Sequence, residues 1–439
     1  MNQRPKQPEV RGLGARGAAL ATLQAVFFNE RPLYDALETS VSKGGLEARD
    51  TAFARAIVMM VLRRLGEIDE IIAAFLREPL PARSGPAELI LRIACAELVF
   101  LEIAAHASVS SAVEMAGHDH RSRHFKGLIN AVARKIASEG KAIAATLDAE
   151  KLNMPAWAWD ACVNAYGEGE TRAMAKAHGT EPPLDITVKN DALGWAQKLQ
   201  AQILPTGTLR RTTGGRVEDL PGYAEGQWWI QDAAAAIPAR LLGDVQGKTV
   251  IDLCAAPGGK TAQLAAAGAT VTAVDLDFNR MRRVIANLQR LDLKAEFEVA
   301  DALEWRPKKL AAAVLLDAPC TATGTVRRHP DVLWRKDMSD VMAQAGLQGR
   351  LIAAAAEMVE PGGMLIYCVC SLSREEGGDV VENFLKDHRN FARQLVTADE
   401  IWGQTQFITE AGDLRTQPGH WPELGGLDGF YACRLRRTT

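Results

Sequence analysis

The sequence lacks the features of several protein classes. No apolar run approaches the ~20 residues that a membrane-spanning helix needs, which excludes an integral membrane protein. The stretch from Met1 to Pro8 contains no apolar segment of the kind found in a secretory signal. Only seven cysteines occur among 439 residues, and most stand singly within apolar runs, as Cys95 does. These features predict a cytoplasmic chain with reduced thiols.

Net charge is also small, −3 at pH 7. It is unevenly distributed, because residues 1–145 carry 19 basic and 16 acidic side chains, whereas residues 146–439 carry 32 and 38. A nucleic-acid surface must therefore be a local patch. The hydrophobic fraction of 47% and the charged fraction of 24% are ordinary for globular proteins. A chain of this length predicts two or three domains.

The hydrophobic pattern divides the chain into three regions. Alanine-rich runs with helical periodicity fill residues 1–145 without a sustained heptad, which predicts an all-α bundle rather than a coiled coil. Residues 146–235 predict a linker and a small α+β subdomain, with an alternating strand at Leu184–Lys189. Residues 236–439 alternate short apolar strands with helices, which predicts a doubly wound α/β domain. Functional residues are expected where the parallel strands of that domain end.

A loop of small residues follows the first predicted strand of the α/β domain. It reads Cys254-Ala255-Ala256-Pro257-Gly258-Gly259-Lys260 and leads into a helix. Small residues let the backbone approach a ligand, and the N–H groups at the start of the helix can point at it. The loop matches neither the dinucleotide motif nor the P-loop, because only one glycine pair precedes the lysine.

Aspartates end the strands that follow. Asp275 ends the second strand and suits the two hydroxyls of a ribose, whereas Asp301 follows the third strand, within reach of a nucleobase amino group. A single aspartate at such a position is more often a helix cap or a turn residue. Several of them around one small-residue loop predict a nucleoside cofactor. S-adenosylmethionine fits better than a dinucleotide, because nothing in the loop suits a pyrophosphate.

Cysteines follow two later strands. One motif is Asp317-Ala318-Pro319-Cys320 and the other is Tyr367-Cys368-Val369-Cys370-Ser371. A free cysteine is usually a small buried hydrophobic residue, but both motifs lie at the expected ligand-binding edge. The Cys-x-Cys pair has no second pair at zinc spacing, and the three histidines at 118, 120 and 124 have no further ligands to complete a site. We therefore expect no metal.

Taken together, these motifs and Arg327-Arg328-His329-Pro330-Asp331 resemble the motif set of the RNA cytosine-5 methyltransferases of the Sun family. The resemblance covers essentially the whole chain, since Ser108–Glu114 and Gly127–Val132 resemble the NusB-like RNA-binding domain found in that family. It implies a multidomain fold with a NusB-like all-α domain over residues 1–145 and a small α+β insert. A Rossmann-like S-adenosylmethionine-dependent methyltransferase domain is implied over residues 236–439.

The resemblance also implies roles for single residues. Cys370 is implied to attack C6 of the cytosine, and Cys320 to assist loss of the C5 proton and release of the product. Asp317 is implied to contact N3 and the exocyclic amine. DNA cytosine-5 methyltransferases instead use a Pro-Cys cysteine, which would nominate Cys320 as the nucleophile. Lys260 is either a residue at the target base or a surface residue at the start of a helix.

The cofactor site implied by these motifs is made of the loop residues and the strand-end acids. These are Cys254, Ala255, Ala256, Pro257, Gly258, Gly259, Lys260, Asp275, Asp301 and Asp317. The sequence departs from the usual family pattern at Thr321, where serine is usual, and at Val369, where threonine is common. Cys368 is an additional thiol beside Cys370.

Two basic segments are candidates for RNA contact. Residues 117–141 hold six basic side chains against two acidic ones, among them Arg121, Arg123 and Lys126. Arg327, Arg328 and His329 follow the first cysteine motif. A charge cluster is more often only a solvated face. The resemblance implies small-subunit (16S) ribosomal RNA as the partner, with the target cytosine unpaired or flipped out, and we expect a monomer. The alternatives are a transfer RNA substrate and a non-catalytic RNA-binding assembly factor.

Overall fold

The computed structural model describes residues 13–439, Leu13 by its backbone alone. The chain forms two compact units. The helical unit extends to Asp160 and also contains His329–Arg335, whereas the catalytic unit comprises Ala161–Arg328 and Lys336–Thr439. The small α+β region belongs to the same unit as the large sheet, and a short segment of the C-terminal region belongs to the helical unit.

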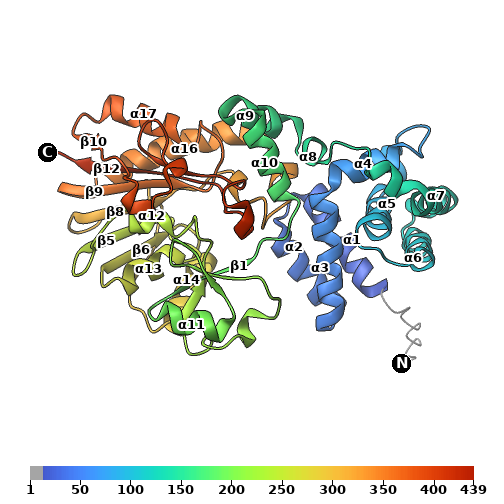
Figure 1. Ribbon diagram of the computed structural model, residues 1–439, viewed down its shortest axis with the longest axis horizontal. Coiled ribbons are helices and arrows are strands. Elements are labelled where there is room, and N and C mark those ends of the chain that lie inside the picture. Colours follow the sequence, from blue (N-terminus) through green and yellow to red (C-terminus); the bar gives the residue numbers. More distant parts are fainter. Residues whose placement is uncertain (1–12) are drawn as a thin grey trace. The chain divides into compact units, whose positions relative to one another are not determined.

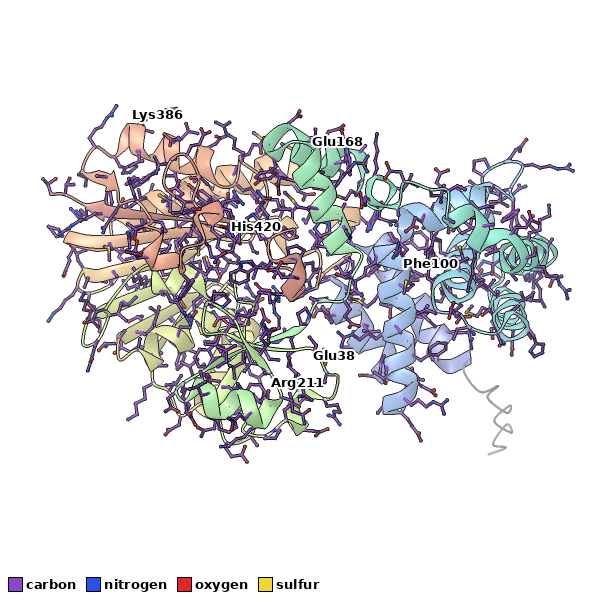
Figure 2. The ribbon with its side chains drawn as sticks, in the orientation of Figure 1. Glu38, Phe100, Glu168, Arg211, Lys386 and His420 are labelled. Atoms are coloured by element: carbon purple, nitrogen blue, oxygen red, sulfur yellow. The ribbon has the colours of Figure 1, made fainter. Side chains whose placement is uncertain are left out.

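Helices make up the helical unit, as the alanine-rich periodicity predicts. They are α1 (Leu13–Asn29), α2 (Leu33–Gly44), α3 (Ala48–Arg63), α4 (Leu65–Ala73), α5 (Ala87–Cys95) with a following π-helical turn (Ala96–Phe100), α6 (Ala105–His118), α7 (Lys126–Ala144), α8 (Ala149–Leu152), the start of α9 (Ala156–Tyr166) and α15 (Val332–Arg335). The guanidinium of Arg64 lies 5.3 Å from the ring centroid of Phe100, which Figure 2 labels.

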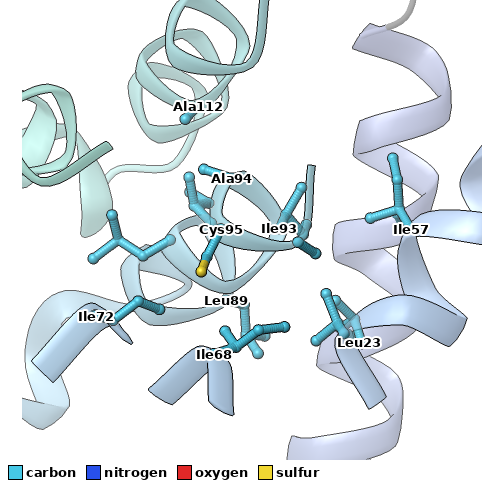
Figure 3. Close-up of a cluster of buried hydrophobic side chains, with 14 of the residues drawn as sticks. Leu23, Ile57, Ile68, Ile72, Leu89, Ile93, Ala94, Cys95 and Ala112 are labelled. Carbon is cyan, nitrogen blue, oxygen red and sulfur yellow. The ribbon is translucent and has the colours of Figure 1, made fainter. Parts of the chain in front are cut away.

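A large apolar core packs helices α1 to α7 together (Figure 3). Leu23 of α1, Ile57 of α3, Ile68 of α4 and Leu89 of α5 are all fully buried within it. Burying a side chain of this size stabilises the fold by roughly 1.5–3 kcal/mol. Cys95 lies in the same core, where burial raises the pKa of its thiol well above the usual range and keeps it protonated.

Helix α2, Leu33–Gly44, does not follow from the alanine-rich pattern. Its second half is rich in serine, threonine and valine, which have modest helix propensity and gave no clear periodicity. The helix begins after Pro32, whose fixed φ suits a helix start, and ends at Gly45, which adopts φ 58°.

The catalytic unit contains the remaining elements. Its helices are the rest of α9, α10 (Glu168–His178), α11 (Ala192–Leu199), α12 (Ile237–Arg240), α13 (Gly259–Ala266), α14 (Phe278–Arg290), α16 (Met338–Ala356) and α17 (Gly378–Asp387). Its strands are β1 (Leu184–Val188), β2 (Gln202–Ile203), β3 (Leu209–Arg211), β4 (Trp228–Ile230), β5 (Thr249–Leu253), β6 (Thr270–Asp275), β7 (Glu296–Val299), β8 (Ala311–Asp317), β9 (Val359–Val369), β10 (Phe391–Arg393), β11 (Leu414–Thr416) and β12 (Phe430–Arg437).

The first four strands form a small antiparallel sheet in the order β2-β3-β1-β4. Asp185 of β1 accepts two hydrogen bonds from Arg210 of β3, at 2.7 and 2.6 Å, and both side chains are buried. Arg210 also donates to the carbonyl of Gly426, at 2.7 Å. This buried ion pair therefore joins the small sheet to the C-terminal part of the catalytic unit.

The large sheet has the order β10-β12-β9-β8-β5-β6-β7, with β11 paired to β12 (Figure 1). Strands β5 to β9 are parallel to one another, whereas β12 runs antiparallel to β9 and β10 runs antiparallel to β12 at the edge. The chain runs outward from β5 through β6 to β7 and then returns to β8 on the other side of β5. The strand order thus reverses between β5 and β8, which is the place where ligands bind in open α/β sheets.

Both faces of the large sheet are buried, which explains the nearly continuous apolar strands. Val314 and Leu316 of β8 face a core that includes Leu351 of α16, whereas Leu315 of the same strand faces a core that includes Ile237 of α12. The doubly wound arrangement predicted from the sequence is therefore confirmed. None of the helices in the described part of the chain has the length and apolarity required to cross a membrane.

Candidate functional site

The loop after β5 is tightly packed. Gly258 adopts φ 99°, and a Cβ there would lie 2.9 Å from Cγ1 of Val284 in α14, so that a larger residue would strain the loop. The N–H groups at the start of α13 come directly after this turn. Cys254 begins the loop with φ 59°, and burial together with the charges of Asp275 and Asp317 raises the pKa of its thiol to about 12.

Asp275 fixes the same loop from the end of β6. Its Oδ2 accepts a hydrogen bond from the Ala256 N–H at 3.1 Å, and its Oδ1 accepts one from the Asp277 N–H at 3.1 Å. Arg280 contacts both Asp275 and the loop: its guanidinium lies 3.7 Å from Asp275 Oδ1 and donates to the Ala256 carbonyl at 2.9 Å. Each carboxylate oxygen can accept a second hydrogen bond, so Asp275 retains capacity for a ligand hydroxyl.

Asp301 lies after β7 and is half-buried. Its Oδ1 accepts a hydrogen bond from the Leu303 N–H at 2.9 Å, which is the turn-capping arrangement considered as the alternative for a strand-end aspartate. Its other oxygen, Oδ2, makes no hydrogen bond within the described part of the chain. The three acids at the ends of β6, β7 and β8 thus line one edge of the sheet on both sides of β5.

Asp317 at the end of β8 is held by two partners. Lys260 Nζ donates to its Oδ2 at 2.7 Å, and the thiol of Cys368 on β9 donates to its Oδ1 at 3.6 Å. Burial alone would lower the pKa of Lys260, but the charge and hydrogen bond of Asp317, together with Cys368 and Asp252, outweigh burial and raise the pKa above the usual range. The ammonium group also lies 4.7 Å from the centroid of the Phe430 ring. Lys260 is 7% exposed, so it is a buried partner of Asp317 rather than a surface residue.

The two motif cysteines lie side by side. Cys320 Sγ and Cys370 Sγ are 3.5 Å apart, and both residues are half-buried. The hydrogen bond to Cys370 and burial both raise the pKa of Cys320, which keeps its thiol protonated. Burial and the charge of Asp317 likewise raise the pKa of Cys368. The sequence placed the three thiols only at strand ends, whereas the structure brings Cys320 and Cys370 into contact and directs Cys368 to Asp317.

The basic residues after the first cysteine motif are enclosed. Arg327 is 1% exposed, and Arg328 forms an ion pair with the buried carboxylate of Asp428. His329 belongs to the helical unit, where its ring packs edge-on against Tyr34 with centroids 5.2 Å apart. RNA contact by these three residues stays a prediction, and their packing in this structure leaves Arg327 no access to a phosphate.

The other predicted RNA contacts are exposed. Arg121, Arg123 and Lys126, here called the basic cluster, lie in and beside the turn of 3₁₀ helix Ser122–Phe125 that joins α6 to α7. Asp119 organises this turn by accepting hydrogen bonds from the N–H groups of Arg121 and Ser122. Exposed cations on an ordered turn can meet a phosphate backbone without rearrangement.

A metal site has no support in the described part of the chain, where no group of three metal-ligating side chains gathers. Neither the three histidines near residue 120 nor the Cys368–Cys370 pair forms such a group. All seven cysteines are free thiols.

Three buried polar residues of the site were not found from the sequence. Asp252 of β5 accepts a hydrogen bond from Thr261 Oγ1 at 2.5 Å beneath the cofactor loop, and burial raises its pKa to about 7. Glu376 and Gln348 lie fully buried beside the cysteine motifs. An acid inside an apolar strand was a usable signal for Asp252, but Glu376 stands in a charged turn sequence that reads as exposed.

Comparison with known proteins agrees with this architecture. Residues 239–436 match the family described as 16S rRNA methyltransferase RsmB/F, and residues 13–138 match the NusB family. A protein of Pseudomonas syringae pv. tomato named ribosomal RNA small subunit methyltransferase B is 33% identical over 445 residues, covering 96% of this chain and 97% of the relative. A protein of the same name from Vibrio cholerae is 32% identical, covering 97% and 98%.

The fold recurs in a solved structure. The crystal structure titled PH0851 superposes with a TM-score of 0.77, covering 98% of this chain and all of that one, at 23% identity. Together with the family matches, this likeness confirms the predicted combination of a NusB-like helical domain and a Rossmann-like methyltransferase domain.

Proposed function

Because the chain belongs to the family of the ribosomal RNA small subunit methyltransferases B, we propose that it methylates C5 of a cytosine in 16S ribosomal RNA. That it is an RNA methyltransferase follows from the family. The choice of cytosine C5 rests on one observation, the contact between the thiols of Cys320 and Cys370 at the ends of two neighbouring parallel strands.

The proposed cofactor is S-adenosylmethionine, and the residues around β5 fit it. Gly258 supplies the positive φ of the loop and lets its backbone pack against Val284, which fixes the turn that leads into the N-terminus of α13. Asp275 would accept the ribose hydroxyls, and Asp301 would accept from the adenine amino group. When bound, S-adenosylmethionine supplies a methyl group activated by its sulfonium sulfur.

Cys370 is the proposed nucleophile. Cytosine C5 is a poor nucleophile until a thiolate adds to C6, which converts the ring into an enamine that can accept a methyl group at C5. The addition forms the Cys370 Sγ–C6 bond and places an electron pair on the ring. Cys320, whose pKa is raised, keeps its proton and can donate a hydrogen bond to the Cys370 thiolate across the 3.5 Å separation.

Asp317 and Lys260 are proposed to act on the other edge of the ring. The Asp317 carboxylate would accept a hydrogen bond from the exocyclic amine. The Lys260 ammonium, 2.7 Å from that carboxylate, would supply the proton that N3 requires as charge develops. The side chain of Asp317 is 28% exposed while that of Lys260 is 9% exposed, so the carboxylate faces the open side of the pair.

Cys320 is proposed to complete the cycle. After methylation, the C5 proton must leave and the Cys370 Sγ–C6 bond must break, with the electron pair of the C5–H bond restoring the C5–C6 double bond. The Cys320 thiol would give its proton to the departing Cys370 sulfur and, as the thiolate so formed, would accept the proton from C5. Both residues end as thiols, and Cys370 loses its proton to solvent before the next cycle.

A cytosine within a helix cannot reach these thiols, so the target must lie in a loop or be flipped out. The basic cluster of the helical unit is the proposed phosphate-binding surface, which makes RNA binding depend on salt.

Bisulfite sequencing of ribosomal and transfer RNA tests this function, using cells with and without the gene and cells that carry a Cys370→Ala variant. We expect one cytosine in 16S ribosomal RNA to lose its protection in both deficient strains. Loss of protection at a cytosine in transfer RNA instead would show that transfer RNA is the substrate. Unchanged protection in the Cys370→Ala strain would support a non-catalytic assembly factor.

A further inference from the structure

One buried carboxylate lies beneath both thiols of the site. Glu376 follows β9 and is fully buried, yet it is not among the residues that a nucleophile, a proton donor or a cofactor site requires. A buried carboxylate costs free energy unless hydrogen bonds compensate it, so its partners indicate what it is kept for.

The partners of Glu376 come from both cysteine loops. On the first loop, Thr321 donates twice, from its backbone N–H at 2.8 Å and from its hydroxyl. On the second loop, Ser371 Oγ donates at 2.5 Å. Thr321 directly follows Cys320, and Ser371 directly follows Cys370. The single carboxylate thus connects the residues next to the two thiols.

Further contacts extend this arrangement. Gln348 of α16 donates to Glu376 Oε1 at 3.1 Å and to the carbonyl of Pro319, the residue before Cys320, at 2.8 Å. The Tyr367 hydroxyl donates to the backbone carbonyl of Glu376. Gln348, Tyr367 and Ser371 are fully buried, so water does not compete for these hydrogen bonds.

We propose that Glu376 is a positioning residue that clamps the Cys320 loop to the Cys370 loop and so sets the separation of the two thiols. Its catalytic consequence rests on the proposed function, because the two thiols act on one base and must lie together. The clamp also accounts for the threonine at position 321, since it keeps the hydroxyl that donates to Glu376.

The clamp depends on the reach of the side chain rather than on its charge. Glutamine keeps the length, and its amide can satisfy the same partners, with Oε1 accepting from the Thr321 N–H and Nε2 donating to the two hydroxyls. Aspartate keeps the charge but withdraws the carboxylate by about 1.5 Å, one carbon–carbon bond, so it cannot reach both loops. A purely electrostatic role predicts the opposite order for the two variants.

The separation of the thiols can be measured without RNA. Diamide oxidises two adjacent thiols to a disulfide, and the rate of that closure reports how often the sulfurs meet. We would follow the Cys320–Cys370 disulfide by peptide mass spectrometry in the full-length wild type, Glu376→Gln, Glu376→Asp and the matched control Glu375→Ala. Glu375 is the neighbouring acid and is half-buried, but it accepts its hydrogen bond from Ser373 within its own loop rather than from the Cys320 loop.

The clamp predicts that Glu376→Gln and Glu375→Ala close the disulfide within about threefold of the wild-type rate, whereas Glu376→Asp closes it at least ~10-fold more slowly. In Glu376→Asp, kcat for methylation should fall by a similar factor, with S-adenosylmethionine affinity unchanged. Normal disulfide closure and normal kcat in Glu376→Gln would show that the length of the side chain matters, because a role of the negative charge predicts that this variant fails.

Two results would overturn the clamp: a wild-type closure rate in Glu376→Asp, or slow closure in Glu376→Gln with normal closure in Glu376→Asp. If Glu376→Asp does not fold, Thr321→Val combined with Ser371→Ala removes one hydroxyl from each loop and must slow closure in its place. If the wild-type protein forms no 5-methylcytidine, the proposed function is wrong. The disulfide rates would still show whether Glu376 sets the separation of the two thiols.

Discussion

Replacing Asp275 with alanine probes the proposed cofactor pocket. The carboxylate is 3% exposed and accepts the Ala256 N–H at 3.1 Å, so its removal leaves a buried donor without a partner. Such a loss costs about 1–3 kcal/mol, which should lower the free energy of unfolding by that amount. A ribose hydroxyl that loses a charged acceptor forfeits roughly 1.5–3 kcal/mol more, because hydrogen bonds to charged groups are the stronger ones. The dissociation constant for S-adenosylmethionine should therefore rise about 10- to 100-fold.

Isothermal titration calorimetry measures that constant, and Asp277→Ala is the matched control. Asp277 is exposed and caps α14 by accepting the Arg280 N–H at 2.9 Å. Its loss should cost stability, about 1 kcal/mol for a cap, but leave the affinity unchanged. Equal affinities of Asp275→Ala and the wild type would refute the ribose assignment. Equal weakening in both variants would refute it as well, because the effect would then belong to the loop.

Three more outcomes are expected. Charge reversal of the basic cluster should weaken 16S RNA binding ~10-fold or more and flatten its salt dependence while sparing cofactor affinity; an unchanged salt slope would remove the cluster from the RNA surface. His178 is buried, and burial lowers its pKa from 6.5 to about 3. Below pH 6.5 the unfolded chain therefore binds a proton that the folded chain does not, so the free energy of unfolding falls as the pH falls. Between pH 7 and pH 5 the loss should be about 2 kcal/mol in urea denaturation and should disappear in His178→Leu; an identical loss in that variant would contradict the assignment. Arg210→Ala should cost ~3–5 kcal/mol by leaving Asp185 buried and unpaired, and a cost below ~1 kcal/mol would show that the pair relaxes without penalty.

Much of the catalytic unit could be predicted from the sequence, because parallel strands buried on both faces leave a clear pattern. The strand-like runs Thr270–Asp275 and Glu296–Val299 of the sequence coincide with β6 and β7, and the runs Thr249–Cys254 and Ala312–Asp317 match β5 and β8 to within one residue. The residues at their carboxyl ends therefore fell at one edge of the sheet as expected. The pattern is weakest beyond Ser371, because β10, β11 and β12 are short or antiparallel and carry arginines within the strand.

The contacts within the site could not be predicted. That Lys260 of α13 is paired with Asp317, or that Cys368 contacts Asp317 while Cys320 contacts Cys370, depends on the register of β9 against β8 and on the paths of the loops that follow them. Sequence patterns give the alternation of a strand but not its register against a distant partner. The sequence also does not predict that His329–Arg335 belongs to the helical unit. Its contacts there, such as the hydrogen bond from Trp334 Nε1 to the Leu62 carbonyl, join segments far apart in the chain.

The most direct test of the proposed chemistry is a denaturing gel that detects covalent protein–RNA complexes. Wild-type protein, Cys370→Ala, Cys320→Ala and the control Cys368→Ala are each incubated with 16S ribosomal RNA and S-adenosylmethionine. If Cys370 attacks C6 and Cys320 assists release, a complex resistant to denaturation accumulates only with Cys320→Ala, and Cys370→Ala forms none and loses turnover. A complex trapped by Cys370→Ala but not by Cys320→Ala would reverse the two roles, and no complex with any variant would contradict covalent catalysis by this thiol pair.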